Sequence, residues 1–378
     1  MEFFKRSPQP TLGVEWEIAC VNPSTGALVR TPKECFDVDG VVPEFFTNTL
    51  ELVSGVHTSS PGAVSDLRGK LEAVRPIVDK QGAKLWASGT HPLAHWQDQE
   101  LSSKSHYSEI IERTQFWGMQ MLIWGLHVHV GIRHEDRVWP IINALMAHYP
   151  QMLAISSSSP GWDGMDTGYA STRTMLYQQL PTAGMPYQFQ SWEEWSNFQI
   201  DQQRSGVVSH IGYMHFDIRP SGKWGTIEVR IADSPTNFTE LRAIVAFTHM
   251  MVVYFDRLLD EGPLPILQPW HVSENKWRAA RYGLDAEIIT DRDTHEAWVR
   301  DELAAWVERL TPLAREFGCE DDLRQVLVVM ERAPTSGSAS CMRPAAGWTR
   351  SSPRTCRFRA GLGLILGFCL GFCLAFGS

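Results

Sequence analysis

Five short segments of the chain alternate between apolar residues and charged or polar ones. Alternate residues of a β-strand point to opposite faces, so each segment predicts a strand with one apolar and one polar face. In the first segment, Val14, Trp16 and Ile18 share one face, and Glu15 and Glu17 share the other. The five segments are Gly13–Cys20, Thr49–Val53, Gly125–Ile132, His215–Pro220 and Gly225–Asp233.

Four longer stretches carry apolar residues at helical spacing and predict helices. One of them follows Asn237, a residue type that favours the N-cap position. The four are Pro61–Gly82, Val138–Leu153, Phe238–Gly262 and Thr294–Gly318. Strands with unlike faces are typical of antiparallel sheets, so we expect an α+β fold and not a doubly wound parallel sheet.

The composition is that of a soluble globular chain that can bury a sizeable core. The 378 residues carry a formal net charge of −9, and the body contains no stripe rich in Lys and Arg, so we expect no nucleic-acid partner. The first ten residues contain no apolar run typical of a secretory signal. Seven cysteines without a C-x-x-C pair favour the reducing cytoplasm.

The last 45 residues differ from the rest of the chain. We assign residues 1–333 to one catalytic domain and 334–378 to an atypical tail, which holds four of the seven cysteines, five arginines and no Asp or Glu. From residue 360 the tail has no charge for 19 residues, a length that could span a membrane. Its glycines argue against a span, so we favour a non-native or frame-shifted tail over a membrane anchor.

The polar faces of the five strands carry Glu, His, Asp and Arg in place of the Lys, Ser and Thr of an ordinary solvated face. If the strands lie side by side, crowded carboxylates repel one another unless cations neutralise them. Divalent metal is the simplest solution, and carboxylates with one imidazole suit Mg²⁺ or Mn²⁺. The His127-x-His129 pair leaves a zinc or iron enzyme, such as a hydrolase or dioxygenase, as an alternative.

Arginines beside a hard metal indicate phosphate chemistry, because guanidinium binds phosphate through two hydrogen bonds. The chain has no G-x-x-x-x-G-K-[ST] motif. We therefore expect metals and arginines, and not a P-loop, to hold any nucleotide.

Several motifs resemble the glutamate–cysteine ligase type 2 family. They are "LGVEWE", "GLHVHVGI", "GTIEVRIAD" and "ENKWRAARYGLDA", while "QMLIWGLHVHVGI", "DTGYASTR" and "QQLPTAG" are similar to its actinobacterial branch. The resemblance covers roughly residues 10–330. It implies a glutamine-synthetase-like catalytic fold, in which a curved antiparallel sheet forms a funnel for Mg²⁺ and ATP with helices packed on its outer face.

The resemblance also implies roles for individual residues. The metal ligands would be Glu15, Glu17, Glu51, His127 and Glu228. The arginines that act on the transferring phosphate would be Arg230 and Arg219. The ATP or substrate contacts would be His129, Arg173, Lys276, Arg278 and Arg281; a structural loop remains the alternative for Arg173, and a solvated helix face for the last three.

The family reaction joins the γ-carboxylate of L-glutamate to the amine of L-cysteine, with ATP as phosphoryl donor and a γ-glutamyl phosphate intermediate. Another amine, or weak non-physiological activity, would also fit. An inactive nucleotide-binding relative is a third alternative, because "ERAPTSGSASCMRPAAGWTR" replaces a C-terminal motif that is usual in the family. The expected partners are these small molecules, with a homodimer as a further expectation.

Overall fold

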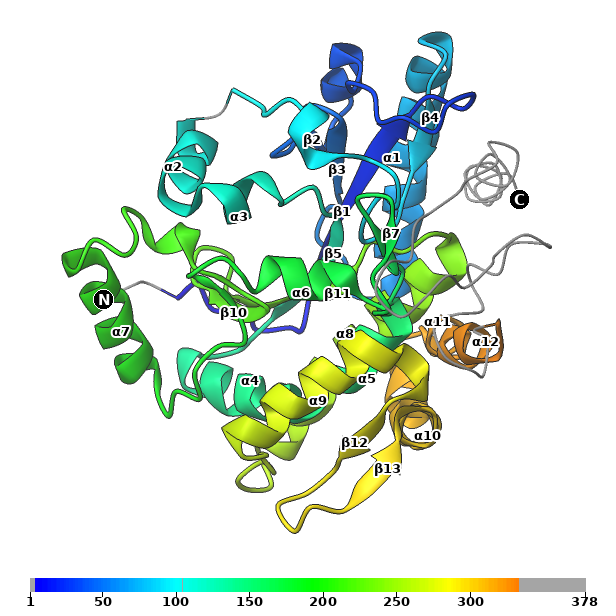
Figure 1. Ribbon diagram of the computed structural model, residues 1–378. Helices are drawn as coiled ribbons and strands as arrows, with labels where there is room; N and C mark the ends of the chain where they lie inside the picture. The colour runs from blue at the N-terminus through cyan, green and yellow to red at the C-terminus, as the bar shows by residue number, and fades with distance from the viewer. Residues whose placement is uncertain (1–3, 104, 333–378) are drawn as a thin grey trace, which may run out of the picture.

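The computed structural model describes residues 4–103 and 105–332 (Figure 1), so the tail assigned to residues 334–378 lies outside the described part. Its centre is a seven-stranded antiparallel sheet with the order β10-β11-β5-β1-β3-β2, in which β4 also pairs with β1. The strands are β1 (Leu12–Val21), β2 (Val41–Pro43), β3 (Thr49–Val53), β4 (Lys84–Trp86), β5 (Gly125–Gly131), β10 (Ile218–Ser221) and β11 (Thr226–Asp233). The predicted α+β class is confirmed.

Four helices cover the apolar face of the sheet: α1 (Ser60–Lys80), α4 (Val138–Ala147), α5 (Tyr149–Ser156) and α8 (Phe238–Leu258). Trp16 and Ile18, which point to this face, are fully buried. Asn237 caps α8 as predicted, since its side-chain oxygen accepts the backbone N–H of Glu240. The sheet therefore buries one face and leaves the charged face for chemistry.

The remaining elements surround this two-layer core. The helices are α2 (Ser105–Thr114), α3 (Phe116–Met119), α6 (Thr172–Tyr177), α7 (Trp192–Arg204), α9 (Pro269–Tyr282), α10 (Val299–Glu316), α11 (Glu320–Leu323) and α12 (Gln325–Arg332). Three small sheets pair β6 (Gly161–Trp162) with β7 (Met165–Asp166), β8 (Ala183–Gly184) with β9 (His215–Phe216), and β12 (Glu287–Ile289) with β13 (Glu296–Trp298). In Figure 1, α2 and α3 stand apart from the helices that cover the apolar face.

Among the described residues, α8 is the one helix long and apolar enough to cross a membrane by length and composition. Within its most apolar stretch, 78% is buried inside the protein. Its apolar composition is therefore explained by its place as the central helix of the core.

Two of the four predicted helices differ from the structure by more than a few residues at their ends. The stretch Val138–Leu153 forms two helices, α4 and α5, because Pro150 lacks the N–H that a continuous helix would need there. The helix predicted from Thr294 begins only at Val299, since the preceding residues form β13 and pair with β12.

The predicted strand at His215–Pro220 is also divided. Its first residues form β9, which pairs in parallel with β8, whereas Ile218–Ser221 form β10 on the edge of the main sheet. The break lies at Asp217, whose backbone carbonyl accepts the N–H of Arg230. Arg219 therefore belongs to the main sheet, whereas His215 belongs to the small sheet of β8 and β9.

A buried histidine in α8 predicts a pH-dependent stability. The imidazole of His249 is fully buried, its Nε2–H donates to the carbonyl of Pro10 at 2.9 Å, and its Nδ1 has no hydrogen-bond partner among the described residues. Burial lowers the pKa of His249 from 6.5 to about 4. Because the folded state disfavours the proton, stability is retained above pH 6.5 and falls as the pH drops toward 4, by up to about 1.4 kcal/mol per pH unit.

The variant His249→Gln keeps an N–H donor and removes the titration, so the slope of unfolding free energy between pH 6.5 and 4 should decrease by that amount. Denaturant unfolding at a series of pH values measures it, with His210→Gln at an exposed position as the control. Equal slopes in wild type and His249→Gln would refute the assignment.

Candidate active site

The register of the main sheet brings the charged residues of five strands together on one face. Several of these residues stand opposite one another across a strand pair. The pairs are Glu17 with Glu51, Glu15 with His127, and Glu228 with both His129 and Arg219. The prediction that these strands lie side by side is confirmed.

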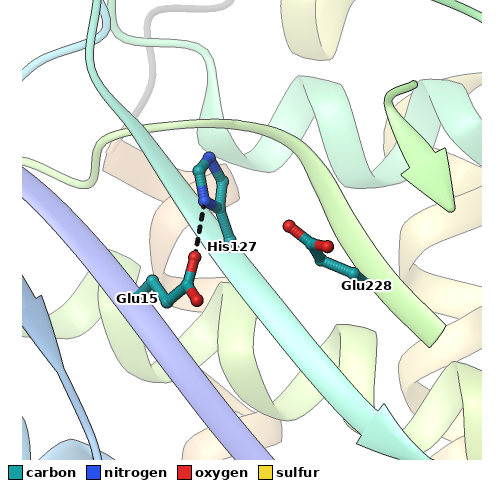
Figure 2. A group of neighbouring side chains, drawn as sticks. All are labelled: Glu15, His127 and Glu228. Carbon is teal, nitrogen blue, oxygen red and sulfur yellow. Dashed lines mark hydrogen bonds and ion pairs between the residues drawn. The ribbon is translucent and has the colours of Figure 1, made fainter. Parts of the chain in front are cut away.

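A first group of possible metal ligands combines Glu15, His127 and Glu228, which come from β1, β5 and β11 (Figure 2). One ligand atom from each lies within 4.8 Å of the other two. Nδ1 of His127 is 3.0 Å from Oε2 of Glu15. On the other side of the group, Nε2 of His129 lies 3.3 Å from Oε1 of Glu15 and 3.9 Å from Oε1 of Glu228.

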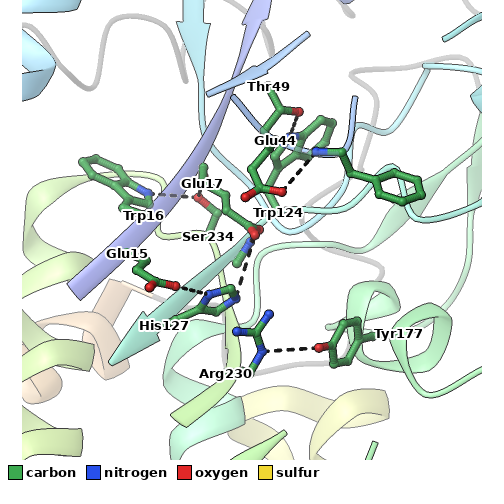
Figure 3. A network of polar contacts seen from close by, with 12 residues as sticks. Glu15, Trp16, Glu17, Glu44, Thr49, Trp124, His127, Tyr177, Arg230 and Ser234 are labelled. Atoms are coloured by element: carbon green, nitrogen blue, oxygen red, sulfur yellow. Dashed lines mark hydrogen bonds and ion pairs between the residues drawn. The ribbon is translucent and has the colours of Figure 1, made fainter. Parts of the chain in front are cut away.

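A second group combines Glu17, Glu51 and the same His127, again with ligand atoms within 4.8 Å of one another. Nε2 of His127 is 3.9 Å from Oε1 of Glu17, so the two nitrogens of one imidazole face the two groups (Figure 3). The backbone N–H of Gly125 donates to Oε2 of Glu17 at 2.5 Å and fixes that carboxylate. The two groups are therefore adjacent and share one histidine.

The first group is balanced by nearby positive charge. Burial alone would raise the pKa of Glu228, but Arg219 at 2.8 Å and Arg230, which also donates to it, lower the pKa well below its ordinary value. Burial also acts to raise the pKa of Glu15, and the hydrogen bonds from His127 and His129 outweigh it and lower the pKa. These carboxylates are ionised.

The second group has an excess of negative charge. Burial, followed by the neighbouring Glu44, raises the pKa of Glu17 to about 7. The same two causes, with Glu15 and Glu17 in addition, raise the pKa of Glu51 well above its ordinary value. Burial lowers the pKa of His127 to about 4, so the imidazole is neutral and contributes no positive charge. A cation that sat here would stabilise all three carboxylates.

These residues fit a pair of divalent cations. Both groups offer carboxylate oxygens, and the neutral imidazole of His127 can offer its one unprotonated nitrogen to one of them, which is the donor set that Mg²⁺ or Mn²⁺ accepts. The raised pKa values of Glu17 and Glu51 indicate that the protein's own side chains do not neutralise the second group. No described cysteine takes part, since Cys20, Cys35 and Cys319 are buried elsewhere.

A cavity that is partly open to solvent adjoins the second group. Its charged and imidazole lining comes from Glu17, Glu44, His127, Arg173, Arg230 and His215. The rest of the lining is Phe45, Phe46, Thr49, Ile110, Met121, Ile123, Tyr177 and Leu180. The cavity can therefore hold an anionic substrate between arginines and the carboxylate groups.

Comparison with known proteins gives the family. The model of the glutamate–cysteine ligase family 2 matches residues 11–339. The chain belongs to this family. It is 60% identical over 337 residues to "Putative glutamate–cysteine ligase 2" of Corynebacterium glutamicum, covering 87% of this chain and 90% of the relative. A similarly named protein of Nocardia farcinica is 49% identical over 340 residues, with coverages of 87% and 90%.

Solved structures agree on the fold. Glutamate–cysteine ligase from Francisella tularensis, solved in complex with AMP, matches with a TM-score of 0.68 at 14% identity and covers 100% of this chain and 90% of its own. A bifunctional glutathione synthetase from Pasteurella multocida matches with a TM-score of 0.61 at 15% identity, covering 86% of this chain and 48% of its own. The expected glutamine-synthetase-like fold is confirmed, and family membership supports a carboxylate–amine ligase.

In this family member, Arg173 reaches the cavity from the first turn of α6 and not from a loop. Ser171 caps the helix. The hydroxyls of Ser171 and Ser159 both donate hydrogen bonds to the buried carboxylate of Asp233. The hydroxyl oxygen of Ser159 also accepts the backbone N–H of Arg173. The guanidinium donates to the carbonyls of Arg230 and Ile231, and the residue as a whole is 3% exposed. Asp233 thus fixes the segment that carries Arg173.

The three basic residues expected on α9 lie outside the cavity lining. Lys276 donates to Asp217 at 2.7 Å in a buried ion pair, in which neither side chain is more than 6% exposed. Arg278 pairs with two glutamates, one on its own helix and one on β13, and Arg281 donates to the carbonyl of Gly168. These contacts tie α9 to its neighbours and give no support to the ATP or substrate roles expected from the resemblance.

Three further residues lie at or behind the site although the sequence pattern does not predict them there. Glu44 follows the three-residue strand β2, which is too short to show alternation. The hydroxyl of Tyr177 accepts a hydrogen bond from Nε of Arg230 at 3.3 Å (Figure 3). Asp233 belongs to a recognised strand, but a bulge between Val229 and Ala232 changes the face to which it points.

The close packing of Gly125 against Arg173 gives a prediction. A Cβ at Gly125 would lie 2.2 Å from Nη2 of Arg173, whose guanidinium is held on both sides. Gly125→Ala should therefore displace Arg173 and lower the unfolding free energy by about 1–3 kcal/mol. Gly69→Ala, on an exposed face of α1 with nothing within 4 Å, should instead raise it by about 0.5–1 kcal/mol. Denaturant unfolding measures both, and equal effects would contradict this packing.

Proposed function

We propose that this protein is an ATP-dependent ligase that joins the γ-carboxylate of L-glutamate to the amine of L-cysteine, with release of ADP and phosphate. The observation that carries the proposal is the pair of carboxylate groups that share His127 beside a cavity lined by Arg173 and Arg230. Crowded carboxylates with adjacent arginines suit a reaction in which anionic phosphates meet an anionic amino acid.

The proposed metals are Mg²⁺ or Mn²⁺. Glu15 and Glu228 would hold one ion, and Glu17, Glu51 and Nε2 of His127 the other, with Glu44 beside the second. When bound, the ions would neutralise charge on the phosphates of ATP and on the reacting carboxylate.

In the first chemical step, a γ-carboxylate oxygen of glutamate attacks the γ-phosphorus of ATP, and the bond from that phosphorus to ADP breaks. The guanidiniums of Arg230 and Arg219 both contact the carboxylate of Glu228, which holds them at the edge of the site. From there the two guanidiniums would bind the transferring phosphoryl group. His129, which lies close to Glu15 and Glu228, is the proposed nucleotide contact on the same side.

In the second step, the amine nitrogen attacks the γ-carbonyl carbon of the glutamyl phosphate. The bond from this carbon to the phosphate oxygen breaks, phosphate leaves, and the nitrogen gives up a proton to water. Arg173, which is buried in the cavity wall, is the proposed partner of the glutamate α-carboxylate. The chain's own residues act by binding and orientation, and no covalent enzyme intermediate is needed.

The nucleotide assignment is supported by the AMP bound to the Francisella tularensis ligase. Family membership favours a ligase over the alternative of a hydrolase or dioxygenase built on the two histidines of β5. Another amine, or an inactive nucleotide-binding relative, remains as an alternative that the assay below separates.

We further propose a cytoplasmic location, in keeping with the unpaired described cysteines, and a homodimer.

Phosphate release tests the proposal. With Mg²⁺, ATP and a panel of amines, we expect release that requires both glutamate and L-cysteine, and formation of γ-glutamylcysteine by mass spectrometry; release with other amines and not with L-cysteine would favour the other-amine alternative. Glu15→Gln or Glu228→Gln should reduce turnover by roughly a hundredfold or more while the circular dichroism spectrum is unchanged, because each removes a proposed metal ligand. Glu72→Gln, on the exposed face of α1, is the matched control. Full activity in either site variant would refute the proposal.

A further inference from the structure

Arg230 lies in the bulge of β11, where the strand loses its regular pairing with β5. The register between the two strands shifts between Val229 and Ala232, so contacts from outside this pairing hold Arg230. Its backbone N–H donates to the carbonyl of Asp217 at 2.7 Å. Its backbone carbonyl accepts a hydrogen bond from Nη2 of Arg173 at 3.2 Å. The backbone position of Arg230 therefore depends on the second arginine of the cavity.

The guanidinium of Arg230 is held at two of its three nitrogens. Nε donates to the hydroxyl of Tyr177 at 3.3 Å (Figure 3), and Nη1 donates to the carboxylate of Glu228. Among the described residues, Nη2 has no hydrogen-bond acceptor. Because a guanidinium is planar, contacts at two different nitrogens fix the direction of the third. The hydroxyl of Tyr177 is thus one of the two groups that orient Nη2.

The ring of Tyr177 contacts the other arginine of the cavity. Arg173 and Tyr177 are four residues apart on α6, so their side chains lie on the same face of that helix. The guanidinium carbon of Arg173 is 5.5 Å from the centre of the ring, which is a cation–π distance. Tyr177 is 9% exposed and lines the cavity, so packing holds its ring in place beside the site. One side chain therefore contacts both arginines.

We infer that Tyr177 is a positioning residue for both arginines: its hydroxyl orients Arg230 toward the transferring phosphoryl group, and its ring supports Arg173 at the α-carboxylate of glutamate. The inference rests on the proposed function and adds a residue to it. A donor that is preorganised for charge developing in the transition state acts on kcat. Support for a group that binds glutamate before and during the reaction acts on KM.

Two variants separate the hydroxyl from the ring. Tyr177→Phe keeps the ring and removes the acceptor of Arg230, so kcat should fall about tenfold while KM for glutamate stays within about twofold. Tyr177→Leu removes the ring as well, so KM for glutamate should also rise about fivefold. Phenylalanine should therefore restore KM relative to leucine and leave kcat low. Should Tyr177→Leu not fold by circular dichroism, the kcat of Tyr177→Phe still tests the inference.

Tyr169 gives a matched control, because it makes the same two kinds of contact outside the cavity lining. Its hydroxyl accepts the indole N–H of Trp277 at 3.2 Å. The guanidinium carbon of Arg281 is 5.8 Å from the centre of its ring. Tyr169→Phe should therefore leave both kcat and KM for glutamate within about twofold of wild type.

A second amine separates positioning of Arg230 from a direct contact between Tyr177 and the amine. Hydroxylamine attacks γ-glutamyl phosphate to give a hydroxamate, and it carries none of the side chain by which cysteine would be bound. If the hydroxyl of Tyr177 acts on phosphoryl transfer, Tyr177→Phe should lower kcat by the same factor with hydroxylamine and with L-cysteine.

The outcomes distinguish the inference from the proposed function. Wild-type protein that forms neither γ-glutamylcysteine nor hydroxamate would overturn the proposed function, and this inference with it. With an active wild type, the inference alone is overturned if Tyr177→Phe keeps kcat within about twofold, if kcat falls with L-cysteine and not with hydroxylamine, or if Tyr169→Phe lowers kcat as much as Tyr177→Phe.

Discussion

Mutual repulsion among buried carboxylates is the constraint on which the rest of this structure depends. Glu15, Glu17, Glu51 and Glu228 stand on one face of the sheet, and none is more than about a quarter exposed at its side chain. The protein's own side chains neutralise the carboxylates at one end of the face and not at the other. At the β10–β11 edge two arginines neutralise Glu228, whereas at the β1–β3 edge the raised pKa values of Glu17 and Glu51 show that positive charge is lacking.

Packing on the opposite face of the sheet offsets this repulsion, because it holds the strands in one register. Trp16 lies between the two glutamates of β1 in the core, and its indole N–H donates to Ser234 at 2.9 Å. Ser234 in turn donates to the carbonyl of Glu17 at 2.6 Å. A one-residue slip of β1 would turn Trp16 to the polar face and the glutamates into the core, so packing and site geometry are specified together.

The sequence alone predicts the sheet and most of its polar face, because a period of two with Glu, His and Arg on one side leaves little freedom in where those side chains point. It cannot predict how distant segments reach the site. Glu44 has no periodic context, Asp233 is reoriented by a bulge, and Arg173 depends on a buried network of serines. Lys276 illustrates the reverse error: a lysine in a family motif is paired with Asp217, a partner 59 residues away in sequence.

The central claim, two adjacent cation sites on either side of His127, is tested most directly by counting bound Mn²⁺ with electron paramagnetic resonance. The account predicts two Mn²⁺ per wild-type chain, and one in Glu17→Gln, which retains the group of Glu15, His127 and Glu228. Wild-type protein that binds no Mn²⁺, or Glu17→Gln protein that still binds two, would contradict it.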